Sequence, residues 1–194
     1  MRDYIRLSGV LLIVCVIAAA LLGFTNDFTA EKIVMQISKA NDEARKAVLP
    51  EADEFEKVDD ATLQSLKSNP DFDTVVEIYN AKAAGAVIGY AVKTAPKGYG
   101  GAVEVIVGVG ADGVVKGVQV GNNTETPGLG KNAEKPKFKD QYNNKTWDMV
   151  IDVIKSGTPK DNQISAIAGS TITSRGVTKG VNQAMAIAKE LAGK

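Results

Sequence analysis

The chain has 194 residues, and its 23 lysine and arginine residues balance 23 aspartate and glutamate residues, so the formal net charge is zero and nothing marks a nucleic-acid-binding protein. It has no histidine and a single cysteine, Cys15, which excludes Ser-His-Asp and Cys-His nucleophiles, the usual zinc sites and iron–sulfur clusters. We therefore expect no metal site and no catalytic side chain for substrate chemistry, and any redox activity would require a bound cofactor.

The first predicted element is an apolar helix over Leu7 to Phe24. No charged residue occurs between Arg6 and Asp27, and a helix of this length spans about 27 Å, close to the hydrocarbon thickness of a bilayer. The alternatives are a cleaved secretory signal, with a cleavage site at Ala18 to Ala20, and a buried core helix. Because the apolar run continues beyond these alanines, we favour an uncleaved anchor in the lipid bilayer over residues 1–26.

Charges that flank the apolar run predict the orientation. Arg2 and Arg6 lie on the short N-terminal flank, which places this end in the cytoplasm by the positive-inside rule, although Lys32 and Lys39 on the other flank weaken the bias. We therefore expect a single-pass protein of the inner (cytoplasmic) membrane whose remaining residues are extracytoplasmic.

The segment after the anchor is predicted to form a helical neck and the beginning of a sheet. Apolar positions at helical spacing predict a helix over residues 28–49 that ends before Pro50. A short strand and a short helix are expected next, at residues 55–58 and 61–68. Runs of β-branched residues then predict strands at 75–79, 87–92, 103–107 and 114–120, the last two joined by a hairpin at Asp112-Gly113. The neck and the first part of the extracytoplasmic domain thus occupy residues 27–92.

The C-terminal part, residues 93–194, is predicted to be a second, functional domain. Residues 131–141 resemble a polar helix or an ordered loop, and residues 147–154 are compatible with a strand. Residues 174–191 place apolar side chains on one helical face. The expected fold class is α+β, with an antiparallel sheet and a C-terminal helix.

Three segments of this domain are candidates for ligand contact. Lys97 to Gly101 is a glycine-rich loop, which by itself is more often a simple turn. In Glu125 to Gly130, Pro127 and Gly128 suit a type II turn, and Leu129 at its tip suits contact with a flat aromatic ring, although a rigid hairpin turn is the alternative.

The third candidate segment, residues 168–174, places hydroxyl and small side chains where a turn meets a helix. The free N–H groups and the dipole of a helix N-terminus suit a phosphate. An ordinary N-cap is the alternative. Arg175, in the first turn, is either a partner for such a phosphate or, as we slightly favour, a solvated helix charge.

Together, in this order and spacing, the three segments resemble the FMN-binding domain family, whose patterns are G-Y-G-G, E-T-P-G-L-G and S-G-A-T-x-T. The resemblance implies FMN bound covalently through a phosphoester to Thr173, formed by a separate flavin transferase that takes FMN from FAD. It also implies a set of cofactor-binding residues: Tyr99, Gly100, Glu125, Thr126, Gly128, Leu129, Gly169, Ser170, Thr171 and Ile172.

Within this family the chain is similar to the G subunits of the Rnf membrane electron-transport complexes, with the C subunits of Na⁺-translocating NADH:quinone oxidoreductases as second choice. The resemblance implies an electron relay in an ion-translocating ferredoxin:NAD⁺ oxidoreductase, a translocase whose other Rnf membrane and redox subunits are its partners. The alternatives are a stand-alone membrane-anchored flavin reductase and a cofactor-free assembly module.

Four positions depart from the family pattern. Ser165, Ala168 and Ser170 stand where the family often has Asp, Ser and Ala, and Asn123 stands where relatives often carry His. The first three departures bear on recognition by the transferase, so we expect flavin binding more firmly than its covalent attachment.

Overall fold

The computed structural model describes residues 2–193, and it describes the side chains from residue 4 onward. The chain divides into two compact units, Met1–Asp42 and Glu43–Lys194. The helix α1 (Arg2–Val48) contributes to both units.

The described part of the first unit is entirely helical. The apolar helix and the neck helix expected from residue 28 are both helical, and α1 runs through them without a break. The hydroxyls of Thr25 and Thr29 donate to the carbonyls of Leu21 and Thr25 at 2.7 and 2.8 Å, so these polar side chains are satisfied within the helix. By length and composition α1 could cross a membrane, a test that a signal sequence also passes.

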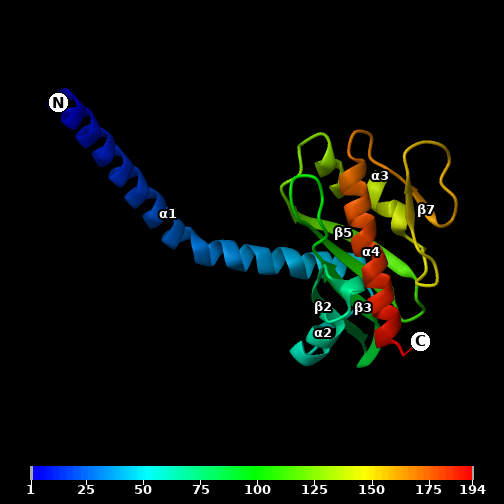
Figure 1. The fold of residues 1–194 in the computed structure, drawn as a ribbon. Helices are drawn as coiled ribbons and strands as arrows, with labels where there is room; N and C mark the ends of the chain where they lie inside the picture. The colour runs from blue at the N-terminus through cyan, green and yellow to red at the C-terminus, as the bar shows by residue number, and fades with distance from the viewer. Residues whose placement is uncertain (1, 194) are drawn as a thin grey trace. The chain divides into compact units, whose positions relative to one another are not determined.

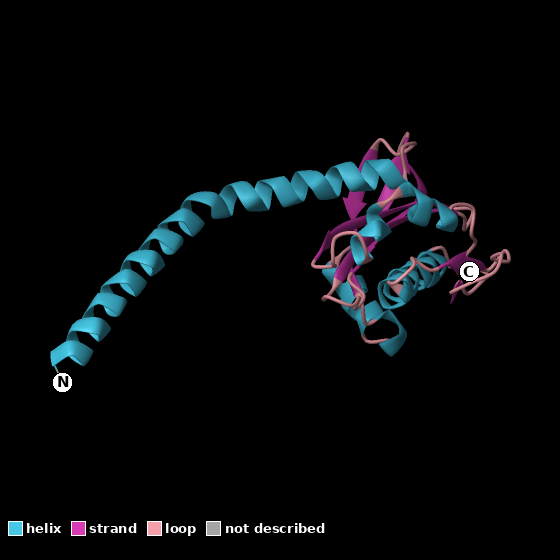
Figure 2. Cartoon of the chain, turned by 90° about the horizontal axis from the view of Figure 1, so that it is seen from above, coloured by secondary structure: helices cyan, strands magenta, loops and turns pink. Residues whose placement is uncertain are grey.

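The second unit is built on an antiparallel sheet whose five strands lie in chain order (Figures 1 and 2). The strands are β1 (Glu54–Lys57), β2 (Val75–Ala83), β3 (Ala86–Thr94), β4 (Val103–Gly110) and β5 (Val115–Asn123). Gly113, at φ +82°, forms the hairpin between β4 and β5. The helix α2 (Asp60–Lys67) and the short 3₁₀ turn η1 (Pro70–Phe72) connect β1 to β2. The predicted α+β class with an antiparallel sheet is confirmed.

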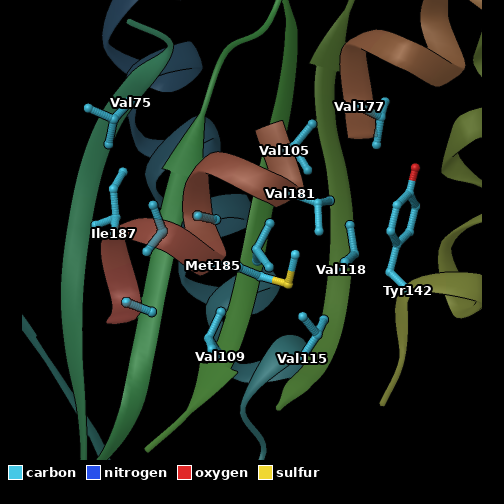
Figure 3. Packing of buried hydrophobic residues seen from close by; sticks show 14 of the residues in the cluster. Val75, Val105, Val109, Val115, Val118, Tyr142, Val177, Val181, Met185 and Ile187 are labelled. Atoms are coloured by element: carbon cyan, nitrogen blue, oxygen red, sulfur yellow. The ribbon is translucent and has the colours of Figure 1, made fainter. Parts of the chain in front are cut away.

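The helix α4 (Thr171–Leu191) packs against one face of this sheet. It begins three residues before the predicted start, so Thr173 lies inside the first turn. Figure 3 shows Val177, Val181 and Met185 of α4 among the valines of β4 and β5. Strand alternation explains this packing, because successive side chains of a strand point to opposite faces.

The opposite face of the sheet is covered by the end of α1. Val48 and Leu49 are buried there with Ile106 of β4. Two glycines make this contact close: a Cβ on Gly108 would lie 2.5 Å from the Val48 carbonyl oxygen, and one on Gly117 would lie 3.1 Å from Val48 Cα. The strand β4 is therefore buried on both faces, with α4 on one side and the end of α1 on the other.

Short elements connect β5 to α4. They are η2 (Gly130–Glu134), α3 (Pro136–Lys139), η3 (Asp140–Tyr142), β6 (Asp152–Ile154) and β7 (Gln163–Ser165). The strand predicted for residues 147–154 is mostly wrong, since only its last three residues are extended, and they pair in parallel with β7, which was not predicted. Trp147 instead lies over Gly113, where an added Cβ would be 2.3 Å from the indole.

Candidate functional site

The three candidate segments meet at one cavity of about 430 Å³. The loop before β4 supplies Tyr99, the turn after β5 supplies Glu125 to Gly130, and the beginning of α4 supplies the rest. The lining residues are Tyr99, Glu125, Thr126, Leu129, Gly130, Gly169, Ser170, Thr171, Ile172 and Thr173. The fold therefore gathers around one space all the predicted cofactor-binding residues except Gly100 and Gly128.

The first turn of α4 forms one wall of the cavity. Gly169 has φ +74°, a conformation that side chains rarely adopt, and it turns the chain into the helix. Ser170 occupies the N-cap position without a side-chain capping hydrogen bond. The Ser170 hydroxyl therefore does not cap the first backbone N–H groups of α4. Free N–H groups and the helix dipole at a helix N-terminus stabilise an anion.

Glu125 occupies the centre of the site. Its side chain is 4% exposed, and its Oε1 accepts the backbone N–H groups of Tyr99 and Gly100 at 2.7 and 2.9 Å. Its Oε2 accepts the hydroxyl of Thr173 at 2.7 Å. A buried carboxylate needs such donors, and one side chain thus joins the glycine-rich loop to α4.

Two glycines leave the space that this carboxylate fills. A Cβ on Gly98 would lie 2.4 Å from Glu125 Oε1, and a Cβ on Gly130 would lie 2.1 Å from Oε2. Both distances are far inside van der Waals contact. The two glycines, Gly98 and Gly130, therefore form a cradle for the carboxylate, because a side chain at either position would collide with it.

Apolar side chains form the rim of the cavity. Tyr99, Leu129 and Ile172 are exposed to 72%, 45% and 55%, although each is large and hydrophobic. Leu129 lies close to the start of α4, because a Cβ on Gly169 would be 3.2 Å from Leu129 Cδ2. A rim of this kind suits a flat, partly apolar ligand, and the volume lies within the range of small-molecule sites.

The remaining predicted residues lie beside the cavity. Gly128 has φ +81°, which agrees with a type II turn, and Gly100 contributes its N–H to Glu125. Asn123 donates to Glu134 at 2.8 Å and accepts the N–H of Glu125 at 3.2 Å, so it braces the turn. Arg175 is exposed and lines a different groove, as expected for a solvated helix charge rather than a group facing the cavity.

Two positions that depart from the family pattern lie outside the cavity. Ser165 and Ala168 line a neighbouring groove with Lys135, Lys137 and Phe138. The N–H of Ser165 donates to Gln141 Oε1 at 2.7 Å. The third departure, Ser170, lies in the cavity wall itself.

The sequence analysis did not identify the role of the cradle glycines or the hydrogen bond between Glu125 and Thr173. Gly98 and Gly130 belonged to the motifs but had no assigned role. Glu125 and Thr173 are 48 residues apart, and no local pattern signals a contact between residues so distant in the chain. The polar, buried environment of Thr173 could not be inferred without the fold.

The part of the chain that forms this cavity also resembles known proteins. Residues 98–186 match the FMN-binding domain family. The chain is 38% identical to the G subunit of the Na⁺-translocating ferredoxin:NAD⁺ oxidoreductase complex of Acetobacterium woodii, over 96% of this chain and 92% of that relative. It is 36% identical to the G subunit of the proton-translocating ferredoxin:NAD⁺ oxidoreductase complex of Clostridium ljungdahlii, over 88% and 81%. Among solved structures, NqrC of Shewanella oneidensis shares the fold, with a TM-score of 0.50 and 19% identity over 64% of this chain and 68% of that chain.

Proposed function

Because the chain belongs to the family of G subunits of ion-translocating ferredoxin:NAD⁺ oxidoreductase complexes, we propose that it is the membrane-anchored electron-transfer subunit of such a complex and carries FMN on Thr173. The observation that carries this proposal is the meeting of three motifs, distant in the chain, at one cavity with the Thr173 hydroxyl in its wall. The relatives' names specify sodium for one complex and protons for the other, so the proposal specifies only ion translocation.

The residues of the cavity fit FMN. The ring would lie against Leu129, with Tyr99 and Ile172 on the same exposed rim. The phosphate would lie at the beginning of α4, where N–H groups and the helix dipole favour negative charge. Bound FMN supplies one- and two-electron transfer, which this chain's own side chains cannot supply because it lacks histidine and has one cysteine.

A covalent bond to Thr173 is the finer part of the proposal. Its hydroxyl is directed into the motif site by Glu125, and it lies in the first turn of α4 rather than in a mobile loop. A separate flavin transferase would form the bond. Such an attachment would suit an electron carrier in an extracytoplasmic position, since a bound flavin could not be lost by dissociation.

Membrane anchoring by α1 completes the proposal. The side chains of the apolar segment are exposed in the described chain, which is costly in water and favourable in lipid. Arg2 and Arg6 favour a cytoplasmic N-terminus in the inner membrane. The partners would be the other membrane and redox subunits of the complex, which would carry out the chemistry of ferredoxin and NAD⁺.

The test is to coexpress the full chain with a flavin transferase and to examine denatured protein on a gel under ultraviolet light. We expect a fluorescent band, and a mass gain of one FMN on the peptide that contains Thr173. Thr173→Ala is expected to remove both signals, while Thr178→Val, which removes a buried hydroxyl further along α4, retains them. A dark band for the unaltered chain, or a flavin retained by Thr173→Ala, would refute the covalent assignment.

A further inference from the structure

The bond between a buried carboxylate and the Thr173 hydroxyl has a chemical consequence beyond flavin binding. Thr173 has no exposed surface, Glu125 has 4%, and Thr173 Oγ1 donates to Glu125 Oε2 at 2.7 Å. Building on the proposed function, we propose that Glu125 is the general base of flavin attachment, so that the acceptor protein supplies a catalytic group for its own modification.

The first support is the direction of the Thr173 hydroxyl. Serine and threonine in helices commonly donate to the carbonyl four residues earlier, as Ser174 and Thr178 of α4 do at 2.9 and 2.8 Å. Thr173 departs from its neighbours and donates to a carboxylate. Because a hydroxyl has one hydrogen, this bond does not use its lone pairs, and attack on a phosphorus atom requires only that the cavity wall open at Thr173, which has no exposed surface.

The second support is the way the carboxylate is aimed. Both backbone N–H groups that hold Glu125, from Tyr99 and Gly100, bind Oε1, so Oε2 is left for Thr173. The cradle glycines, Gly98 and Gly130, limit the space around both oxygens. The geometry is that of a base oriented by a third group and placed within hydrogen-bond distance of its nucleophile.

The step balances as a phosphoryl transfer without oxidation or reduction. As Thr173 Oγ1 forms its bond to the FMN phosphorus of FAD, its proton passes to Glu125 Oε2. The bond from that phosphorus to the bridging oxygen breaks, and AMP leaves with the electron pair. The carboxylate becomes neutral as the phosphate arrives, so two negative charges do not face each other in a buried site.

The experiment measures the rate of flavin attachment to the full chain in detergent, with purified transferase, magnesium and varied FAD. Glu125→Gln keeps the size of the side chain but cannot accept the proton. We expect the maximal rate to fall by at least about 100-fold, the lower end of what a general base contributes, with little change in the FAD concentration for half-maximal rate.

The matched control is Glu134→Gln, the same change at an exposed carboxylate that accepts from Asn123. It should react like the unaltered chain. Thermal unfolding and circular dichroism establish whether Glu125→Gln is folded, and a second variant, Gly130→Ala, displaces the carboxylate without removing it. Equal rates for folded Glu125→Gln and the unaltered chain overturn this inference alone, whereas no attachment to the unaltered chain overturns the proposed function.

Discussion

Two of the buried hydroxyl centres of α4, at Thr173 and Thr178, lie less than two turns apart and have different surroundings. In the first, Thr173 donates to Glu125 beside a cavity. In the second, Thr178 lies 2.8 Å from the hydroxyl of Tyr142 within the core, and the Tyr142 ring also meets Phe138 edge to face. A threonine hydroxyl thus lies beside the candidate site at position 173 and in the packed interior at position 178.

What differs is the partner and the neighbouring space. Thr178 donates to the Ser174 carbonyl, so the single hydrogen of Tyr142 must donate to Thr178. This centre is neutral and internally complete. The Thr173 centre contains the carboxylate of Glu125 and borders the cavity of the candidate site. Burial and hydrogen bonding are therefore common to both hydroxyls, and the carboxylate partner and the neighbouring cavity are what set apart the one proposed to carry the flavin.

Among the variants that test the difference between the two centres, Gly130→Ala is expected to have the largest effect, which is on the rate of flavin attachment at Thr173. The added methyl group would lie 2.1 Å from Glu125 Oε2, and the carboxylate must move away from Thr173 to admit it. We expect attachment of flavin to slow by about 100-fold or more, as for loss of a general base, measured as fluorescence of denatured protein against time.

Gly108→Ala is the matched control for that variant. Its methyl group would lie 2.5 Å from the Val48 carbonyl oxygen, on the opposite face of the sheet. It should lower thermal stability and leave the rate of flavin attachment to the folded protein unchanged. If Gly130→Ala is flavinylated as fast as Gly108→Ala, the position of the carboxylate does not matter.

Thr178→Val is expected to act on the second centre alone. The substitution keeps the shape of the side chain but leaves the buried Tyr142 hydroxyl without its acceptor. Leaving such a donor unsatisfied costs about 1–3 kcal/mol in the free energy of unfolding, which denaturant titration measures. Flavin attachment should be unchanged, and its loss would contradict the division into two centres.

The smallest effect is expected from Tyr142→Phe, because Thr178 keeps its bond to the Ser174 carbonyl. We expect a loss of about 0.5–1.5 kcal/mol near neutral pH. The variant should also be less sensitive to alkali, because burial raises the pKa of the Tyr142 hydroxyl above its ordinary value.

The sign of that alkaline effect follows from the two states of the chain. Below about pH 10 the phenol is neutral in both, but above it only the unfolded chain ionises, so the unaltered protein loses stability as pH rises. Tyr142→Phe removes this contribution. Parallel stability curves for the two proteins between neutral pH and about pH 11 would contradict the assignment.

Much of the fold could be predicted from local patterns. The β-branched runs of β2 to β5 and the Asp112-Gly113 hairpin are local signals, and the structure confirms them. The anchor and neck helices expected from the apolar patterns form one continuous helix, in which the hydroxyls of Thr25 and Thr29 donate to carbonyls of the preceding turn. The parallel pairing of β6 with β7 joins two strands separated by a loop, and strands of three residues are too short to give a sequence pattern that predicts it.

The candidate site was also predictable in part. Each of its three motifs is a continuous stretch of sequence, so most of the residues that line the cavity could be selected before the fold was known. Their arrangement in space could not, because it depends on how the turn after β5 meets the beginning of α4. The role of Gly98 and Gly130 appears only when the Glu125 side chain is placed between them.

The separation of Glu125 and Thr173 along the chain also bears on biogenesis. The carboxylate reaches the hydroxyl only after β5 and α4 have both been incorporated into the finished domain. On the proposed mechanism, an incompletely folded chain would present the threonine without its base and would remain unlabelled. Cofactor attachment would then act as a quality-control step, reserving the cell's flavin for subunits ready for assembly.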